Sequence, residues 1–396
     1  MFTGQIKRLY MKVGIVSINK YVQEINCGSM LQAFALQRFI QSLGHEAELV
    51  DYFPRYRIGI NTHRPYLSRS VGKRERVLYA NNFWELRKRW RDFRDFCARY
   101  LTFSKLRYSY DNFQTNDYDC YVIGSDTVWN VPQTRFEPAY YGEFDCMKRC
   151  VAYAASFGDS IYDEKDRARF RQYLKKFSAV SIREKTNMEA FDQAWREKVE
   201  VVCDPTFLLD KKVYDEIAVS PMRRGKYLLL YMVYQNNPLI RKRVDGYAKK
   251  HGLEVIEISL FKKNLVVRAL SSVANICGYG HRASELSVDN LIPHLMRYDA
   301  GIGEWLGLIR EADMVVTNSF HASVFSILFK RNFCNFSRRG GGVKVRFLCE
   351  KLGIAGRHLG EDAEIPETRI DYAEVSDRLS GWRDESARFL SRALRG

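Results

Sequence analysis

Short apolar runs alternate along the chain with stretches that have apolar residues at helical spacing. Residues 12–19 form a largely apolar run, residues 31–40 place apolar side chains three or four positions apart, and residues 47–52 form a second run. This order predicts a strand, a helix and a strand, which is the β-α-β unit of a parallel sheet. The same pattern predicts further strands at 118–123, 150–155, 179–182 and 199–203.

The segment 220–226 (SPMRRGK) interrupts this alternation and is typical of a linker, because it combines Pro and Gly with three basic residues. The alternation then begins again, with a strand, a helix and a strand at 227–234, 240–250 and 253–259. We therefore predict an α/β protein with an N-terminal domain at 11–220 and a C-terminal domain at 226–396. Each domain is expected to be doubly wound and Rossmann-like, and the two should face each other across a cleft.

Positive charge is concentrated in one part of the N-terminal domain. The 396 residues include 63 Lys and Arg and 47 Asp and Glu, a net charge of +16, and the segment 55–107 alone holds 15 basic and 4 acidic residues. This basic insertion contains a predicted amphipathic helix whose apolar positions are Phe83, Leu86, Trp90, Phe93 and Cys97. Its aromatic face could pack on its own domain or rest on an anionic membrane surface. Nucleic-acid binding is the weakest interpretation, because no nucleic-acid-binding motif accompanies the charge.

Apolar runs and cysteines exclude several classes of protein. The longest apolar run, 227–234, is far shorter than the roughly 18 residues that a membrane helix needs. The first ten residues lack an apolar segment, so we expect no secretion signal. The nine cysteines include no CxxC pair, which favours reduced thiols in the cytoplasm and no metal site. We expect a cytoplasmic protein that can lie peripherally at the inner face of the membrane.

Loops after the predicted strands carry the candidate binding residues, because ligands of parallel sheets lie at the carboxyl ends of strands. The loop 124–130 (GSDTVWN) combines hydroxyls, a carboxylate, an indole and an amide, which suits a sugar or a capped turn with a packed Trp. The turn at 26–29 can face an anion or act as an ordinary helix cap. Small residues at 154–158 allow a ligand to approach closely or form a tight turn.

Charged residues also end two of the predicted strands. Arg183 can hold a carboxylate or phosphate through two hydrogen bonds, or pair internally with its neighbour Glu184. Asp204 follows the next strand and is interpreted as the cap of a turn.

The segment 314–323 is the strongest candidate site. Its predicted strand ends in Thr317, Asn318, Ser319 and His321, and a helix of small and apolar residues follows. A His beside hydroxyls at a helix N-terminus can bind or protonate an anionic ligand, or be satisfied by local capping. Further along, the loop 338–346 (RRGGGVKVR) can close on a phosphate or remain a solvated surface loop.

Six motifs occur in an order that resembles the polysaccharide pyruvyl transferase family. They are NCGSMLQAFAL (26–36), VIGSDTVWN (122–130), AYAASFG (152–158), SIRE (181–184), CDPTFLL (203–209) and VVTNSFHASVFSILF (315–329). The resemblance implies transfer of an enolpyruvyl group from phosphoenolpyruvate to a sugar of a surface polysaccharide precursor, forming a ketal and releasing phosphate. It also implies a glycosyltransferase-B-like pair of domains, with phosphoenolpyruvate as donor substrate and no separate cofactor.

Donor contacts implied by the resemblance are an Arg in an SxRE motif and a His in an RLH motif. Arg183 matches the first and His321 the second, but the tripeptide here is Ser-Phe-His, so the Arg of RLH is absent. The missing charge could come from Arg338, Arg339, Lys344 or Arg346, of which Arg346 is preferred.

These considerations assign roles to strand-end residues. The expected catalytic groups are His321, Arg183, Asp126 and Glu184. His321 is expected to act as the acid or to stabilise the departing phosphate, and either carboxylate can act as the base. The expected donor-binding residues, in the C-terminal domain apart from Arg183, are Asn318, Ser319, His321, Arg183, Lys344 and Arg346. The expected acceptor-binding residues are Asn26, Gly28, Ser125, Asp126, Trp129, Asn130 and Ser156.

Two other functions fit the same sequence features. A nucleotide-sugar-dependent glycosyltransferase would share the two-domain architecture, and a non-enzymatic, membrane-associated sugar-binding protein would use the basic insertion as its anchor. The expected partners are phosphoenolpyruvate, a nucleotide- or lipid-linked sugar acceptor and an anionic membrane surface contacted through 55–107.

Overall fold

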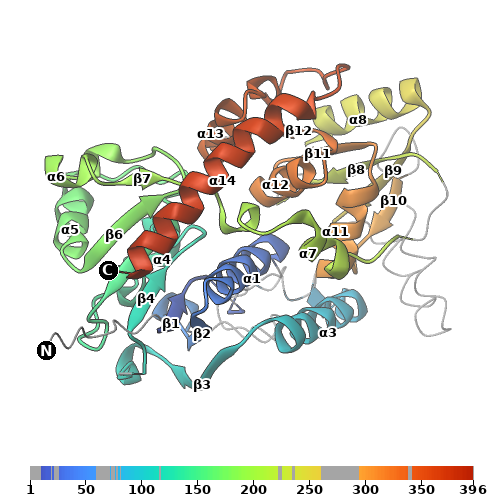
Figure 1. Ribbon diagram of the computed structural model, residues 1–396. Helices are drawn as coiled ribbons and strands as arrows, with labels where there is room; N and C mark the ends of the chain where they lie inside the picture. The colour runs from blue at the N-terminus through green and yellow to red at the C-terminus, as the bar shows by residue number, and fades with distance from the viewer. Residues whose placement is uncertain are drawn as a thin grey trace, which may run out of the picture.

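Two α/β domains lie side by side in the computed structural model (Figure 1). The structure describes residues 10–18, 20–21, 26–58, 72, 76, 79–80, 82–115, 117–221, 225–233, 237–259, 294–337 and 341–395. Among the described helices, none has the length and apolarity that crossing a bilayer requires. The eight cysteines in the described residues are free thiols.

The N-terminal domain is built on a seven-stranded sheet in the order β3-β2-β1-β4-β5-β6-β7, in which every neighbouring pair is parallel. Its strands are β1 (Lys12–Val16), β2 (Glu46–Tyr52), β3 (Phe103–Tyr108), β4 (Cys120–Ile123), β5 (Cys150–Ala155), β6 (Phe177–Ile182) and β7 (Glu200–Val201). Its helices are α1 (Cys27–Ser42), α3 (Phe83–Tyr100), α4 (Val131–Thr134), α5 (Glu164–Leu174), α6 (Gln193–Arg196) and α7 (Lys211–Ile217). The central strands β4 and β5 are buried along their whole length, which explains their unbroken apolar sequence.

The C-terminal domain repeats this design with six parallel strands in the order β10-β9-β8-β11-β12-β13. The strands are β8 (Tyr227–Tyr231), β9 (Glu254–Ile258), β10 (His294–Arg297), β11 (Met314–Thr317), β12 (Asn332–Phe336) and β13 (His358–Leu359). The helices are α8 (Pro238–His251), α11 (Ile302–Glu311), α12 (Phe320–Leu328), α13 (Val343–Lys351) and α14 (Tyr372–Arg395). The predicted fold class, two doubly wound domains in a glycosyltransferase-B-like pair, is confirmed.

One hydrophobic core runs through both domains. Phe34 of α1 packs edge-on against Tyr214 of α7, and Tyr214 packs against Phe325 of α12 with ring centroids 5.0 Å apart. Helix α1 is buried along most of its length because neighbours cover it on both sides. Its N-terminus therefore lies where the two domains meet.

Helix α14 joins the domains a second time. The Tyr372 hydroxyl at its start donates to the Ser326 carbonyl of the C-terminal domain, whereas the Ser386 hydroxyl accepts from the Cys203 amide of the N-terminal domain. Figure 1 shows this helix running from one domain onto the other. The predicted boundary at 226–396 stays a prediction, and the structure adds that the end of this segment packs on the N-terminal domain.

The basic insertion contributes α3, and its aromatic face packs inward. Trp90, Phe93 and Phe96 are buried in the shared core, so these rings contact protein. Lys88 on the opposite flank pairs with Glu304 of α11 at 2.7 Å. The packing interpretation of this helix is therefore correct, and contact of the insertion with a membrane stays a prediction.

Candidate active site

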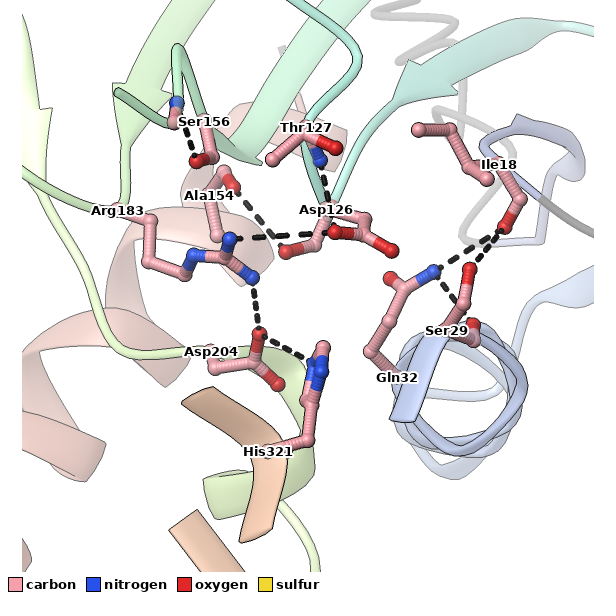
Figure 2. Close-up of polar contacts among 12 residues, drawn as sticks. Ile18, Ser29, Gln32, Asp126, Thr127, Ala154, Ser156, Arg183, Asp204 and His321 are labelled. Carbon is pink, nitrogen blue, oxygen red and sulfur yellow. Dashed lines mark hydrogen bonds and ion pairs between the residues drawn. The ribbon is translucent and has the colours of Figure 1, made fainter. Parts of the chain in front are cut away.

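Loops after three strands of the N-terminal sheet meet helix α12 of the C-terminal domain at the boundary between the domains (Figure 2). Asp126 follows β4, Arg183 follows β6 and Asp204 follows β7, while His321 lies in the first turn of α12 after β11. All of these strands are parallel to their neighbours, so their carboxyl ends share one edge of each sheet. Arg183 and His321 were predicted to act together, and the structure brings both of them to Asp204.

Arg183 is the centre of this cluster and is 2% exposed. Its Nη1 donates to Asp204 Oδ2 at 2.7 Å, its Nε lies 3.5 Å from Glu184 Oε2, and its Nη2 lies 4.0 Å from Asp126 Oδ1. Burial alone would lower the pKa of Arg183, but these three carboxylates outweigh it and raise the pKa. Among the described residues, the buried Nε and Nη2 have no hydrogen-bond acceptor, and the guanidinium lies 4.3 Å from the centroid of the Phe320 ring.

His321 approaches the same carboxylate from the C-terminal domain. Its Nε2 lies 3.6 Å from Asp204 Oδ2, and the Ser319 hydroxyl caps α12 by accepting from the Ala322 amide. A Cβ atom on Gly28 would overlap the His321 ring, so only glycine fits there. Gly28, predicted to bind the acceptor, instead allows α1 to pack directly on His321.

Asp204 was interpreted only as a turn cap, and its contact with both cations was missed. Its Oδ1 does cap the turn, accepting from the amide and hydroxyl of Thr206, while Oδ2 faces Arg183 and His321. Burial would raise the pKa of Asp204, but the nearby His321 and Arg183 side chains hold it well below its usual range. Its place directly after a parallel strand was the sequence signal that could have identified it.

Asp126 lies on the other side of Arg183 in a left-handed backbone conformation, with φ of 65°. Its Oδ1 accepts from the Thr127 amide at 2.9 Å. Burial would raise the pKa of Asp126, but the charges of His321, Arg183 and Lys344 outweigh it and lower the pKa. These charges keep Asp126 ionised, which is the form that can accept a proton from a hydroxyl.

Glu184, the other predicted base, is fully buried and fixed by hydrogen bonds. Its Oε1 accepts from the Ser156 hydroxyl and from the amides of Phe157 and Gly158 at 2.7 to 3.2 Å. This arrangement makes Glu184 a positioning residue that holds the turn after β5. Asp126 is the base candidate that we retain.

Lys344, rather than Arg346, brings the additional charge to the cluster. Burial and the charge of Arg183 lower the pKa of Lys344, while Asp126, Glu184 and Asp159 oppose that shift. Arg346 is exposed, and its charge acts on His358. The structure thus favours Lys344 over Arg346 as the additional charge, and donor contact by Arg346 stays a prediction. Arg338 and Arg339 lie outside the described residues.

Asp159 holds Lys344 near the cluster. Its Oδ1 accepts from the amides of Gly342 and Val343 at 2.9 and 3.2 Å, which caps α13 from the opposite domain. Asn318 has a similar ordering role, because its amide bonds both backbone groups of Val233.

Three of the predicted acceptor residues are buried and already engaged. Trp129 packs inside the N-terminal core, and its indole N–H donates to the Tyr140 carbonyl, so its ring cannot stack on a sugar. The Ser125 hydroxyl donates to the Ala154 carbonyl, and the Ser156 hydroxyl donates to Glu184. These three predictions were wrong because the turn after each strand points the side chains into the sheet's own packing.

Asn26 and Asn130 both serve as helix caps in the structure. Asn26 accepts from the Ser29 amide at the start of α1, and Asn130 accepts from the Gln133 amide at the start of α4. Asn26 is exposed and Asn130 partly exposed, so acceptor contact by either residue stays a prediction. The described residues include no group of three His, Cys, Asp or Glu side chains placed to hold a metal ion.

Fold and site together define a two-domain α/β protein with an Arg–carboxylate–His cluster at the domain boundary. The sequence matches the family described as Polysaccharide pyruvyl transferase over residues 26–340. The chain belongs to the polysaccharide pyruvyl transferase family, as its motifs predicted, and is accordingly a transferase of polysaccharide biosynthesis. A search of curated proteins gives no significant match.

Solved structures with related architecture include UDP-GlcNAc 2-epimerases. The enzyme from Rickettsia bellii aligns with a TM-score of 0.49 at 10% identity, covering 96% of both chains. The enzyme from Neisseria meningitidis, bound to UDP-GlcNAc, aligns with a TM-score of 0.47 at 9% identity, and the alignment covers 96% of this chain and 94% of the other. The enzyme from Methanocaldococcus jannaschii aligns with a TM-score of 0.46 at 9% identity, and the alignment covers 93% of this chain and 92% of the other.

Proposed function

We propose that this cluster transfers an enolpyruvyl group from phosphoenolpyruvate to two hydroxyls of a sugar in a surface polysaccharide precursor. Membership of the family supports the reaction class. The observation that carries the choice of donor is the Arg183 guanidinium, buried between two domains with two N–H groups unsatisfied beside His321 and Lys344. A small dianionic or trianionic ligand is what such a set of donors binds.

The proposed reaction must account for two hydroxyl protons and for phosphate as the leaving group. One acceptor hydroxyl adds to C2 of the donor while a proton is delivered to the methylene carbon, giving a methyl group. Phosphate then leaves as the second hydroxyl closes the ketal. Of the two hydroxyl protons, one ends on the methyl carbon and the other on phosphate.

His321 is the proton donor in this proposal, and Asp126 accepts the first hydroxyl proton. Arg183 and Lys344 neutralise the donor's carboxylate and phosphate, and Asp204 acts through His321 and Arg183 as a positioning residue. Loss of a general acid costs about 10²–10⁴-fold in rate. We expect His321→Ala to lose turnover in that range while its melting temperature stays near that of the unmodified protein.

Donor binding can be tested without knowing the acceptor, because a ligand that binds the native state raises the melting temperature. Phosphoenolpyruvate is compared with inorganic phosphate, UDP and UDP-glucose, for the unmodified protein and for Arg183→Lys, which keeps the charge but loses the planar fork. We expect a shift with phosphoenolpyruvate that exceeds the phosphate control and is reduced in the variant. A shift with UDP compounds alone would replace this proposal with a nucleotide-sugar-dependent glycosyltransferase.

A further inference from the structure

A pocket lies between α3 and strands β2 and β3, and it has no role in the chemistry described above. Its volume is about 510 Å³, which is the size of a small-ligand site. The polar and aromatic side chains that line it come from the strands, from α3 and from the segment after β1: Lys20, Tyr21, Asp51, Trp90, Arg94 and Arg107.

Aromatic rings and cations alternate along the pocket wall. Lys20 Nζ lies 2.7 Å from Asp51 Oδ2 and 4.3 Å from the centroid of the Phe103 ring. The Tyr21 hydroxyl donates to Asp51 at 2.5 Å, and the Arg107 guanidinium lies 4.8 Å from the Tyr21 ring. The carboxylate of Asp51 is therefore already neutralised by Lys20.

Two further guanidinium groups line the pocket, those of Arg94 and Arg107. Across the described ranges neither makes a hydrogen bond or an ion pair with a carboxylate, and that of Arg107 lies 4.6 Å from the Phe53 ring. Each guanidinium presents N–H groups in a planar fork that matches phosphate oxygens. The pocket therefore offers two guanidinium groups that can bind a phosphate ester, beside aromatic residues that can contact the attached organic group.

The pocket opens on the same edge of the sheet as the catalytic cluster. Asp51 and Arg107 lie near the ends of β2 and β3, and Asp126 follows β4. Strands β2 and β1 separate β3, which carries Arg107, from β4, so about 14 Å lies between β3 and β4. A short saccharide spans that distance.

We propose that this pocket binds the diphosphate group of the sugar acceptor, while the sugar itself reaches Asp126. The inference rests on the proposed function for the identity of the acceptor. A nucleoside diphosphate sugar and a polyprenyl diphosphate sugar share the diphosphate ester, and in both the attached organic group would lie along the wall of the pocket.

Isothermal titration calorimetry with inorganic pyrophosphate, UDP-glucose and farnesyl diphosphate tests this assignment. We expect the double variant Arg94→Ala/Arg107→Ala to lose affinity for all three by about tenfold or more per guanidinium, because each lost charge-assisted hydrogen bond costs about 1.5–3 kcal/mol. Arg91→Ala is the matched control, since Arg91 lies one turn away, is exposed and pairs with Asp92. Its affinities should stay unchanged.

His321→Ala separates this pocket from the donor site, because it should keep pyrophosphate binding. Equal pyrophosphate affinity in the double variant and the control, or no pyrophosphate binding by the unmodified protein, overturns the assignment. Tighter binding of UDP-glucose than of pyrophosphate supports a nucleotide-linked acceptor, and tighter binding of farnesyl diphosphate supports a lipid-linked one. Equal affinity for all three ligands overturns the assignment to the acceptor.

Phosphoenolpyruvate is titrated in parallel, so that failure of the proposed donor can be distinguished from failure of the proposed diphosphate pocket. The double variant should bind it normally. Pyrophosphate binding that depends on Arg94 and Arg107, with no phosphoenolpyruvate binding by any form, would refute the proposed donor and leave the pocket's anion specificity standing.

Discussion

The position of the His321 ring in the catalytic cluster depends on the absence of a Cβ atom at Gly28. A methyl group at this position would overlap the His321 ring, which is packed against α1. We expect Gly28→Ala to lower turnover about a hundredfold, the scale of loss for a displacement of about 1 Å. Unfolding free energy should fall by about 1–3 kcal/mol through overpacking. Steady-state kinetics and denaturant unfolding measure the two effects.

Gly246→Ala is the control for that substitution. Gly246 lies within α8, and a Cβ there would meet nothing within 4 Å. Alanine in place of a helical glycine gains about 0.5–1 kcal/mol, so this variant should be slightly more stable and fully active. Normal turnover in Gly28→Ala would contradict the packing argument.

Asp126 provides a second test at the scale of one residue. The charges of His321, Arg183 and Lys344 hold the pKa of Asp126 below its ordinary value of 3.8, so it stays ionised down to lower pH than an isolated carboxyl. We expect Asp126→Asn to abolish most turnover at every pH while phosphoenolpyruvate still binds. If turnover of the Asp126→Asn variant recovered to the level of the unmodified protein at high pH, a residue other than Asp126 would be the base.

At the level of elements, the cap of α13 links the two domains through one carboxylate. We expect Asp159→Ala to cost about 1 kcal/mol of stability and to weaken phosphoenolpyruvate binding, because Lys344 follows directly in the capped turn. Asp163→Ala is the control, since Asp163 caps α5 by the same contact with the Asp166 amide. Equal phosphoenolpyruvate affinity in both variants would show that the cap does not position Lys344.

Strands and strand-end residues were predictable from the sequence for a physical reason. A strand buried on both faces must be an apolar run, and the residues after it lie at the ligand edge, so Asp126, Arg183 and His321 could be identified. The direction of a loop side chain depends on backbone angles that composition does not encode. Trp129 was therefore placed on the wrong side, and the link from Asp204 to His321, which crosses domains, was not visible.

The whole molecule should lose stability in acid. Burial would raise the pKa of Glu257, but His294 and Arg241 lower it below the ordinary 4.5, and Asp126 and Asp204 are lowered as well. A depressed folded-state pKa adds stability above the unfolded pKa, and that stability is lost as pH falls through the folded value. A tenfold difference in proton affinity between the folded and unfolded states corresponds to about 1.4 kcal/mol of stability.

Chemical denaturation between pH 7 and pH 3 measures this dependence. We expect the unfolding free energy to fall steadily below about pH 4.5, and Glu257→Gln to make that fall shallower while lowering stability at pH 7. Stability that rose on acidification would contradict the charge arrangement.

Helix α14 has a consequence for how substrates enter and leave. The chain crosses between the domains near residue 220 and again within this helix, whose two ends are bonded to different domains. Two chain connections restrict how one domain can move on the other, because they oppose twisting and sliding and leave rotation about the line that joins them. Arg183 and His321 belong to different domains, so such a rotation would change the distance between these two side chains.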